Sequence, residues 1–308
     1  MIDKFLSYIA HELCLSPNTV SAYRTDLLMW HDFATRGGQR PFTPEAYTVN
    51  QLRLWVAESA RTVSVRTVRR RVQSLRAFYR YLMRNCGLLN NPAAELQLSR
   101  LPKSLPVYVR PAETEKMIDS LQERCDRSLN DLRDCLIVDM LYSTGMRCSE
   151  LIGLTDGNVD TRRGELKVLG KRNKERIIPF GKELNTLITK YREIRGASAP
   201  GAPFFTRPDG RPLYRKMVYN VVHRAMLDEG VHAERMSPHV LRHSFATDML
   251  NEGAGLNSVQ QLLGHASLTT TQIYTHITYR ELQHNYQLAH PRAQKNHNHG
   301  SKNSGHPR

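Results

Sequence analysis

Four separated segments in the second half of the chain concentrate arginine, lysine, histidine and tyrosine, residue types that bind and attack phosphate esters. The first is GMRCSE around Arg147, at a turn that follows Ser-Thr-Gly. A guanidinium held in such a turn presents a planar fork of donors that suits a phosphate. The second is the basic turn GKRNK, whose lysines could enter a nucleic-acid groove. Both segments predict anion binding.

The third segment, SPHVLRH, is typical of a helix start, because its Ser-Pro pair suits the N-cap and the first helical position. His239 and Arg242 are three residues apart, so they share a face near the positive end of that helix, which favours an anion. His243 follows His239 at the spacing of a zinc pair. The metalloprotease pattern needs glutamate directly after the first histidine, where this chain has Val240. We therefore expect no metal site.

The fourth segment, LLGHASLTTTQIYTH, places His265 directly after a glycine that ends a helix, and Tyr274 nine residues further on. A tyrosine is usually a packing residue. A phenol beside phosphate-binding arginine and histidine can instead act as a nucleophile. The four segments together therefore allow a covalent attack on a phosphate ester.

The elements that must position these residues form one unit over residues 112–290. Apolar runs in GELKVLG and RIIPF flank the basic turn, which indicates a β-hairpin. Apolar periodicity predicts the helices of this unit at 112–126, 131–144, 182–195, 213–229, 238–252, 256–264 and 268–286. Residues 99–111 contain three prolines together with the basic residues Arg100 and Lys103, among others, and are interpreted as a linker rather than a core element. The polar tail, residues 291–308, is expected to be disordered.

Residues 1–98 are predicted to be mostly helical. Ser16 and Pro17 start the second helix, Gly37 and Gly38 end it, and a third helix begins near Thr48. The fourth carries one apolar stripe, made of Val65, Val68, Val72, Leu75, Tyr79 and Leu82. Its arginines lie mostly off that stripe and repel one another unless an anion pairs with them. We expect five of them to contact DNA: Arg66, Arg69, Arg70, Arg76 and Arg80.

Composition narrows the class of protein. The chain has 308 residues, enough for about two domains. Lys+Arg 44 against Asp+Glu 29 gives a net charge of +15, which favours a polyanionic partner. No stretch approaches the ~18 apolar residues of a membrane span, and acidic residues near the N-terminus do not fit a signal peptide. Five cysteines without CxxC spacing favour a reducing cytoplasm.

The ordered motifs resemble the tyrosine recombinases of the phage-integrase superfamily, most closely the Xer (XerC/XerD) branch. The matching stretches are YSTGMRCSELIGL, GKRNKERIIPF, SPHVLRHSFAT, LLGHASLTTTQIYTH and the closing HPRA, with SPNTVSAYRTDL in the first part. The resemblance implies a mainly α chain with a small β-hairpin or sheet. A helical, SAM-like core-binding domain (1–98) would precede a mixed α/β catalytic domain (112–290).

Carried over residue by residue, the family's catalytic set becomes Arg147, Lys171, His239, Arg242, His265 and Tyr274. Glu150 matches the family's acidic residue after the first arginine. Lys174 is the alternative for the lysine role, and Arg172 and Lys174 are expected to contact DNA. The implied reaction proceeds through a 3′-phosphotyrosyl intermediate and a Holliday junction, without a metal or other cofactor.

The same resemblance implies the partners. They are a duplex DNA site and partner recombinase subunits in a tetrameric synapse, with a DNA translocase as a candidate regulator and no membrane. The segment after Tyr274, with Ile277, Leu282, Tyr286 and Leu288 as its apolar positions, needs a packing surface, either its own domain or, as the resemblance implies, a neighbouring subunit. The expected setting is the nucleoid in the cytoplasm, where the enzyme would resolve chromosome dimers at cell division.

Three alternatives stay open at this point. A mobile-element integrase or excisionase of the same family would use the same residues. A type IB topoisomerase uses similar chemistry, but the Xer-like first domain argues against it. A DNA-binding module that has lost catalysis is disfavoured by the intact set of six residues. A strand-exchange assay with two sites would separate recombinases from both non-recombinases.

Overall fold

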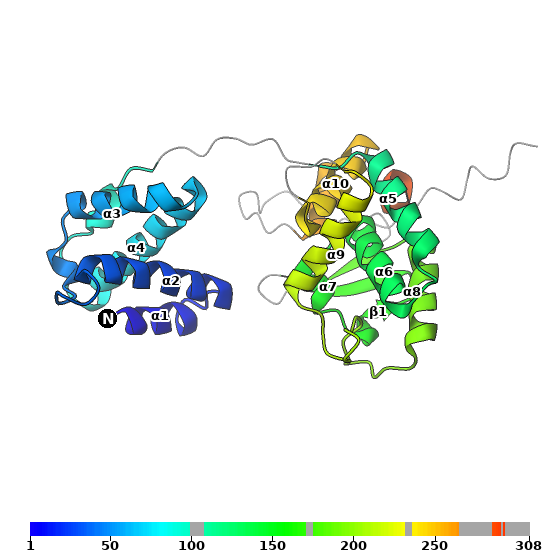
Figure 1. The fold of residues 1–308 in the computed structure, drawn as a ribbon, viewed down its shortest axis with the longest axis horizontal. Coiled ribbons are helices and arrows are strands. Elements are labelled where there is room, and N and C mark those ends of the chain that lie inside the picture. Colours follow the sequence, from blue (N-terminus) through cyan, green and yellow to red (C-terminus); the bar gives the residue numbers. More distant parts are fainter. Residues whose placement is uncertain (99–107, 171–174, 232–235, 265–284, 291, 293–308) are drawn as a thin grey trace, which may run out of the picture. The chain divides into compact units, whose positions relative to one another are not determined.

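The computed structural model of the chain describes residues 1–98, 108–170, 175–231, 236–264, 285–290 and 292 (Figure 1). It divides into two compact units, Met1–Ser104 and Leu105–Arg308. Both units are mainly helical, and the second also carries a small antiparallel sheet. The predicted fold class is therefore confirmed. None of the described helices is long and apolar enough to cross a lipid bilayer.

The described part of the first unit, residues 1–98, contains four helices and two 3₁₀ turns. Its elements are α1 (Ile2–His11), α2 (Pro17–Thr35), η1 (Pro44–Ala46), α3 (Val49–Thr62), α4 (Val65–Asn85) and η2 (Pro92–Glu95). As predicted, Ser16 caps α2: its hydroxyl accepts a hydrogen bond from the Thr19 N–H at 3.3 Å, and Pro17 follows at the first helical position. The helix ends where Arg36 and Gly37 adopt positive φ angles of 47° and 68°.

The apolar stripe of α4 forms much of the core of this unit. Val68, Val72, Leu75, Tyr79 and Leu82 are buried, as predicted. Val65 is not part of the core, because it lies in the first turn of α4 and is 45 % exposed. Phe78 of α4, which the predicted stripe did not include, is fully buried. It packs with Trp30 of α2, the two ring centres lying 6.0 Å apart.

The second unit surrounds one central helix. Its helices are α5 (Pro111–Arg124), α6 (Leu129–Thr144), α7 (Cys148–Ile152), α8 (Lys182–Arg195), α9 (Arg215–Asp228), α10 (Pro238–Asn251) and α11 (Leu256–Leu263), with η3 at Asp156–Asn158. α6 is buried almost throughout and packs against α5, α8, α9 and α10 (Figure 1). Residues 285–289 add a helical turn near the end of the chain.

The predicted hairpin is present in a three-stranded antiparallel sheet. The strands β1 (Val159–Asp160), β2 (Glu165–Leu169) and β3 (Glu175–Pro179) lie in that order. Leu166 pairs with Ile178, and Leu169 pairs with Glu175, where the two long strands approach the basic turn. The turn itself, residues 171–174, lies outside the described residues.

The second unit begins inside the segment that the sequence assigns to the linker. Val109 is 1 % exposed and belongs to the main core of this unit, and its N–H donates to the Ser244 hydroxyl at 2.8 Å. Pro111 is already the first residue of α5. Residues 99–107, with Arg100 and Lys103, and the tail apart from Arg292 lie outside the described residues.

The end of the chain packs on its own unit. Tyr286, Ala289 and His290 are at most 2 % exposed, and Tyr286 and Ala289 share a core cluster with α10 and α11. Leu288, which the sequence places in the docking stripe, is 57 % exposed. Residues 285–290 thus contact their own unit through Tyr286, Ala289 and His290, while docking of the segment on a neighbouring subunit stays a prediction, and Ile277 and Leu282 lie outside the described residues.

Candidate active site

Arg147 projects from a tight turn between α6 and α7. Gly145 makes this turn possible, because its φ is +60° and a Cβ there would lie 2.4 Å from the Phe245 ring. The Arg147 N–H donates to Glu150 Oε2 at 2.7 Å, which caps α7. The guanidinium then bonds Glu150 Oε1 at 2.8 Å and the Gly264 carbonyl at 2.9 Å. The side chain is 29 % exposed, so it is anchored and still reachable from solvent.

Arg242 approaches the same place from α10. Its guanidinium donates to the Gly145 carbonyl and to the Leu263 carbonyl, both at 2.6 Å. Burial, and then the nearby positive charge of Arg147, lower the pKa of Arg242 to about 10. The charge of Arg147 disfavours the charged form of Arg242, so an anion that binds near both groups would relieve this repulsion.

His239 lies on α10 three residues before Arg242. Pro238 begins this helix as predicted, and Ser237 occupies the N-cap position, but its side chain makes no capping hydrogen bond among the described residues. Partial desolvation, and then the positive charges of His243, Arg242, Arg215 and Arg147, lower the pKa of His239 below its ordinary 6.5. The imidazole is therefore neutral at pH 7 and able to accept a proton.

Arg176 of β3 was not singled out from the sequence. Its guanidinium forms a two-point contact with Glu150, at 2.7 Å and 2.9 Å, and its Nε–H donates to the Leu262 carbonyl at 2.8 Å. Burial alone would raise the pKa of Glu150, but the hydrogen bonds and charge of Arg176 and the hydrogen bonds of Arg147 outweigh burial and lower it. No local sequence signal could have found this contact, because Arg176 and Glu150 are 26 positions apart in the chain.

Three arginines thus meet the last carbonyls of α11. Arg176 binds the carbonyl of Leu262, Arg242 that of Leu263, and Arg147 that of Gly264. The C-terminal end of a helix carries partial negative charge, which cations stabilise. The chain leaves this cluster directly toward His265. The described part of the chain therefore brings Arg147, Arg242 and His239 to the point where the fourth motif begins.

Five predicted site residues lie outside the described residues: Lys171, Arg172, Lys174, His265 and Tyr274. Gly170 and Glu175 flank the basic turn in sequence, and Gly264, which precedes His265, accepts a hydrogen bond from Arg147. The spatial grouping of the six predicted catalytic residues therefore remains a prediction for three of them.

Arg70 and Arg76, two of the five α4 arginines that are predicted to contact DNA, make polar contacts with other elements of the first unit. Arg70 pairs with the fully buried Asp26 of α2 at 2.6 Å, and Arg76 donates to the carbonyls of Ala93 and Leu96 at 3.1 Å and 2.6 Å. The anion that pairs with Arg70 in the structure is thus a carboxylate on another helix. The other three predicted contacts are Arg66 and Arg80, which are exposed, and Arg69, which is half-buried.

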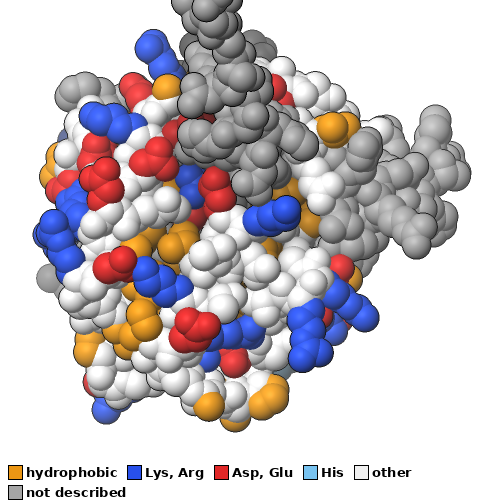
Figure 2. All heavy atoms as spheres, turned by 90° about the vertical axis from the view of Figure 1, so that its right-hand side faces the viewer, with side chains coloured by type: hydrophobic (Ala, Val, Ile, Leu, Met, Phe, Trp, Pro, Cys, Tyr) orange, Lys and Arg blue, Asp and Glu red, His pale blue; other side chains and the backbone are white. Residues whose placement is uncertain are grey.

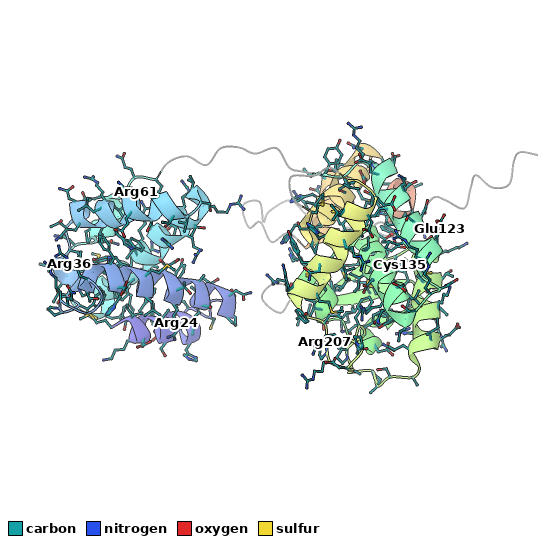
Figure 3. All side chains as sticks on the ribbon, in the orientation of Figure 1. Arg24, Arg36, Arg61, Glu123, Cys135 and Arg207 are labelled. Carbon is teal, nitrogen blue, oxygen red and sulfur yellow. The ribbon has the colours of Figure 1, made fainter. Side chains whose placement is uncertain are left out.

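The positive charge of the chain does not form a continuous basic area on every face of the second unit. On the face in Figure 2, acidic and basic side chains are interspersed without a continuous area of one sign. α5 has such a mixture, with Lys116 exposed beside Asp119 and Glu123, and Figure 3 labels Glu123 on the outer side of this helix. The surface of α5 is therefore not expected to bind a polyanion.

Comparison with known proteins gives the family. Residues 108–281 match the phage integrase family, and residues 2–85 match the SAM-like N-terminal domain of phage integrases. The tyrosine recombinase XerC of Chlorobaculum parvum is 34 % identical, covering 95 % of this chain and 94 % of the relative. XerC of Alcanivorax borkumensis is 35 % identical, covering 96 % and 94 %.

The crystal structure of the XerH site-specific recombinase bound to difH substrate has a similar fold, with a TM-score of 0.65 and 24 % identity, covering 86 % of this chain and 78 % of that one. The chain belongs to the phage integrase family, whose members with this arrangement are tyrosine recombinases. Within the family it is a Xer-type enzyme, a site-specific recombinase that cleaves and rejoins DNA.

Proposed function

We propose that this recombinase cleaves a duplex site with Tyr274 at a phosphate held by Arg147 and Arg242. The observation that carries the proposal is the convergence of these two guanidinium groups on the carbonyls of Gly145, Leu263 and Gly264. Their described bonds use two of the five N–H donors that each arginine has. The remaining donors suit the non-bridging oxygens, where charge grows in the pentacoordinate transition state.

The proposed reaction balances without an external energy source. The Tyr274 oxygen attacks phosphorus, its proton passes to neutral His239, and the bond between phosphorus and the 5′ oxygen breaks. Lys171 gives that leaving oxygen a proton, and His265 donates a hydrogen bond to the phosphate. The resulting 3′-phosphotyrosyl bond conserves the phosphodiester energy, so a 5′-hydroxyl of the partner duplex can reverse the step and create a Holliday junction.

The wider role follows from the same reaction. Residues 1–98 and 112–290 would contact one duplex, with residues 99–111 as their connection, and Arg66, Arg69, Arg80, Arg172 and Lys174 would reach its phosphates. Recombinase subunits would assemble as a tetrameric synapse at the nucleoid in the cytoplasm, under control of a DNA translocase. The Xer names of the curated relatives favour resolution of chromosome dimers at cell division over integration of a mobile element.

A nicked suicide substrate tests the nucleophile. Tyr274→Phe removes one oxygen and leaves the basic surface intact, so we expect unchanged DNA affinity and no covalent adduct. Tyr279→Phe, five residues further along the same segment, is the matched control and should form the adduct at the wild-type rate. An adduct formed by the Tyr274→Phe protein would refute the assignment.

A further inference from the structure

We propose that Arg176 is a positioning residue, which holds Arg147 and the end of α11 in the arrangement that cleavage requires. This inference rests on the proposed function of Arg147 as a phosphate ligand. Arg176 itself is not assigned to the phosphate, because its described hydrogen bonds go to Glu150 and to the Leu262 carbonyl. It acts through these two groups.

The first connection runs through a shared carboxylate. Glu150 Oε1 accepts from both Arg147 at 2.8 Å and Arg176 at 2.7 Å, and Glu150 Oε2 accepts from the Arg147 N–H and from Arg176. The Glu150 side chain is only 2 % exposed, so water cannot replace a lost partner easily. Without Arg176, Glu150 would be free to turn, and the guanidinium that it orients would turn with it.

The second connection runs through α11. The Nε–H of Arg176 bonds the Leu262 carbonyl, and its side chain packs against Gly264, where an added Cβ would lie 3.1 Å from Cδ. Gly264 also has a φ of +64° and accepts a hydrogen bond from Arg147. Arg176 therefore contacts the last residues before His265, and it does so from the strand that follows the Lys171 turn.

The geometry requires a guanidinium rather than any positive charge. Two parallel N–H groups bind the two oxygens of Glu150 while Nε–H points to a carbonyl, an arrangement that a lysine ammonium cannot reproduce. Arg176→Lys keeps the charge and loses the fork, and it is therefore the variant of choice. Arg192→Lys is the matched control, because Arg192 likewise binds a carboxylate, Asp156, and two backbone carbonyls, yet none of its described bonds reaches the site.

Single-turnover cleavage of the suicide substrate by the full chain separates positioning from binding. For Arg176→Lys we expect the rate at saturating DNA to fall by at least about 10-fold, while the dissociation constant for DNA changes by less than about 3-fold. Arg192→Lys should keep the wild-type rate. A wild-type rate in Arg176→Lys, or an equal loss in both variants, would overturn the proposal.

Amide hydrogen exchange in the free protein provides a readout that does not depend on cleavage. The Arg147 N–H is bonded to Glu150, so its exchange should accelerate by about 10-fold or more in Arg176→Lys and stay unchanged in Arg192→Lys. Unchanged protection of this amide in Arg176→Lys would also overturn the positioning role. If wild type formed no Tyr274 adduct, the proposed function would fail, whereas this exchange rate would still decide whether Arg176 holds Arg147.

Discussion

Replacing Arg292 by methionine should strongly destabilise the second unit. The Arg292 side chain is 3 % exposed, and its guanidinium lies 3.1 Å from Asp139 on α6 and 3.0 Å from Glu183 on α8. Asp139 is fully buried, so the substitution leaves its carboxylate with the hydrogen bond from Ser143 and without this cation. Removing one partner of a buried ion pair costs about 3–5 kcal/mol.

Cys135 offers a local probe of that cost. It is fully buried on α6, one helical turn before Asp139, and Figure 3 shows it within the helices of the second unit. Its thiol can react with an alkylating reagent only when the unit opens. Because 1.4 kcal/mol is a factor of ten, the expected loss accelerates labelling by roughly 100- to 3,000-fold. Peptide mass spectrometry distinguishes Cys135 from the other four cysteines.

Arg224→Met is the control for this experiment. Arg224 is 85 % exposed and lies 3.9 Å from Asp228, and exposed pairs of this kind contribute at most about 1 kcal/mol. Labelling of Cys135 should therefore change little. If Arg292→Met left the labelling rate at the wild-type value, the ion pairs at the end of the chain would not stabilise the unit, and the reasoning from burial would be refuted.

Three further predictions concern the site. Because neutral His239 is the proposed base and its pKa lies below 6.5, the cleavage rate constant at subsaturating DNA should stay level as the pH falls to 6.5 and decline only below it; an inflection above pH 6.5 would contradict this role. Gly264→Ala forces a Cβ into a left-handed turn against Arg176, so we expect a loss of about 1–2 kcal/mol in thermal unfolding and slower cleavage, and an unchanged melting curve would speak against the close contact. Lys171→Ala should cleave slowly on normal DNA and recover on a substrate with a bridging 5′ sulfur, which leaves without a proton; recovery of Lys174→Ala instead would exchange the two roles.

Local sequence signals predicted the local structure well. The Ser16 cap, the glycines that end helices and the apolar runs that form β2 and β3 depend on neighbouring residues, and each is present. The prediction that Val65 belongs to the buried stripe was wrong, because helical periodicity cannot distinguish the exposed first turn of α4 from the buried rest of the helix. The start of the second unit was missed for a similar reason, since Val109 is buried by residues far along the chain.

Long-range ion pairs could not be predicted in the same way. Arg70 meets Asp26 across 44 positions, and Arg176 meets Glu150 across 26, so no local pattern connects them. The order of the motifs predicted Arg147 and Arg242 as site residues. Arg176 was not singled out, because it follows a basic turn that was interpreted as DNA-binding. Only the folded chain shows that its side chain contacts Glu150 and α11.

The hydrogen bond between Asn285 and Ser258, at 3.0 Å, bears on the exchange of DNA strands. Ser258 lies on α11 (Leu256–Leu263), so this hydrogen bond joins two residues of one subunit that lie on either side of the stretch 265–284 in sequence. A DNA end joined to Tyr274 would therefore be attached to a stretch of chain whose two flanking residues are anchored on the same subunit. Exchange between two duplexes would then require the free 5′ ends to travel, while each phosphotyrosyl end stays with the subunit that formed it.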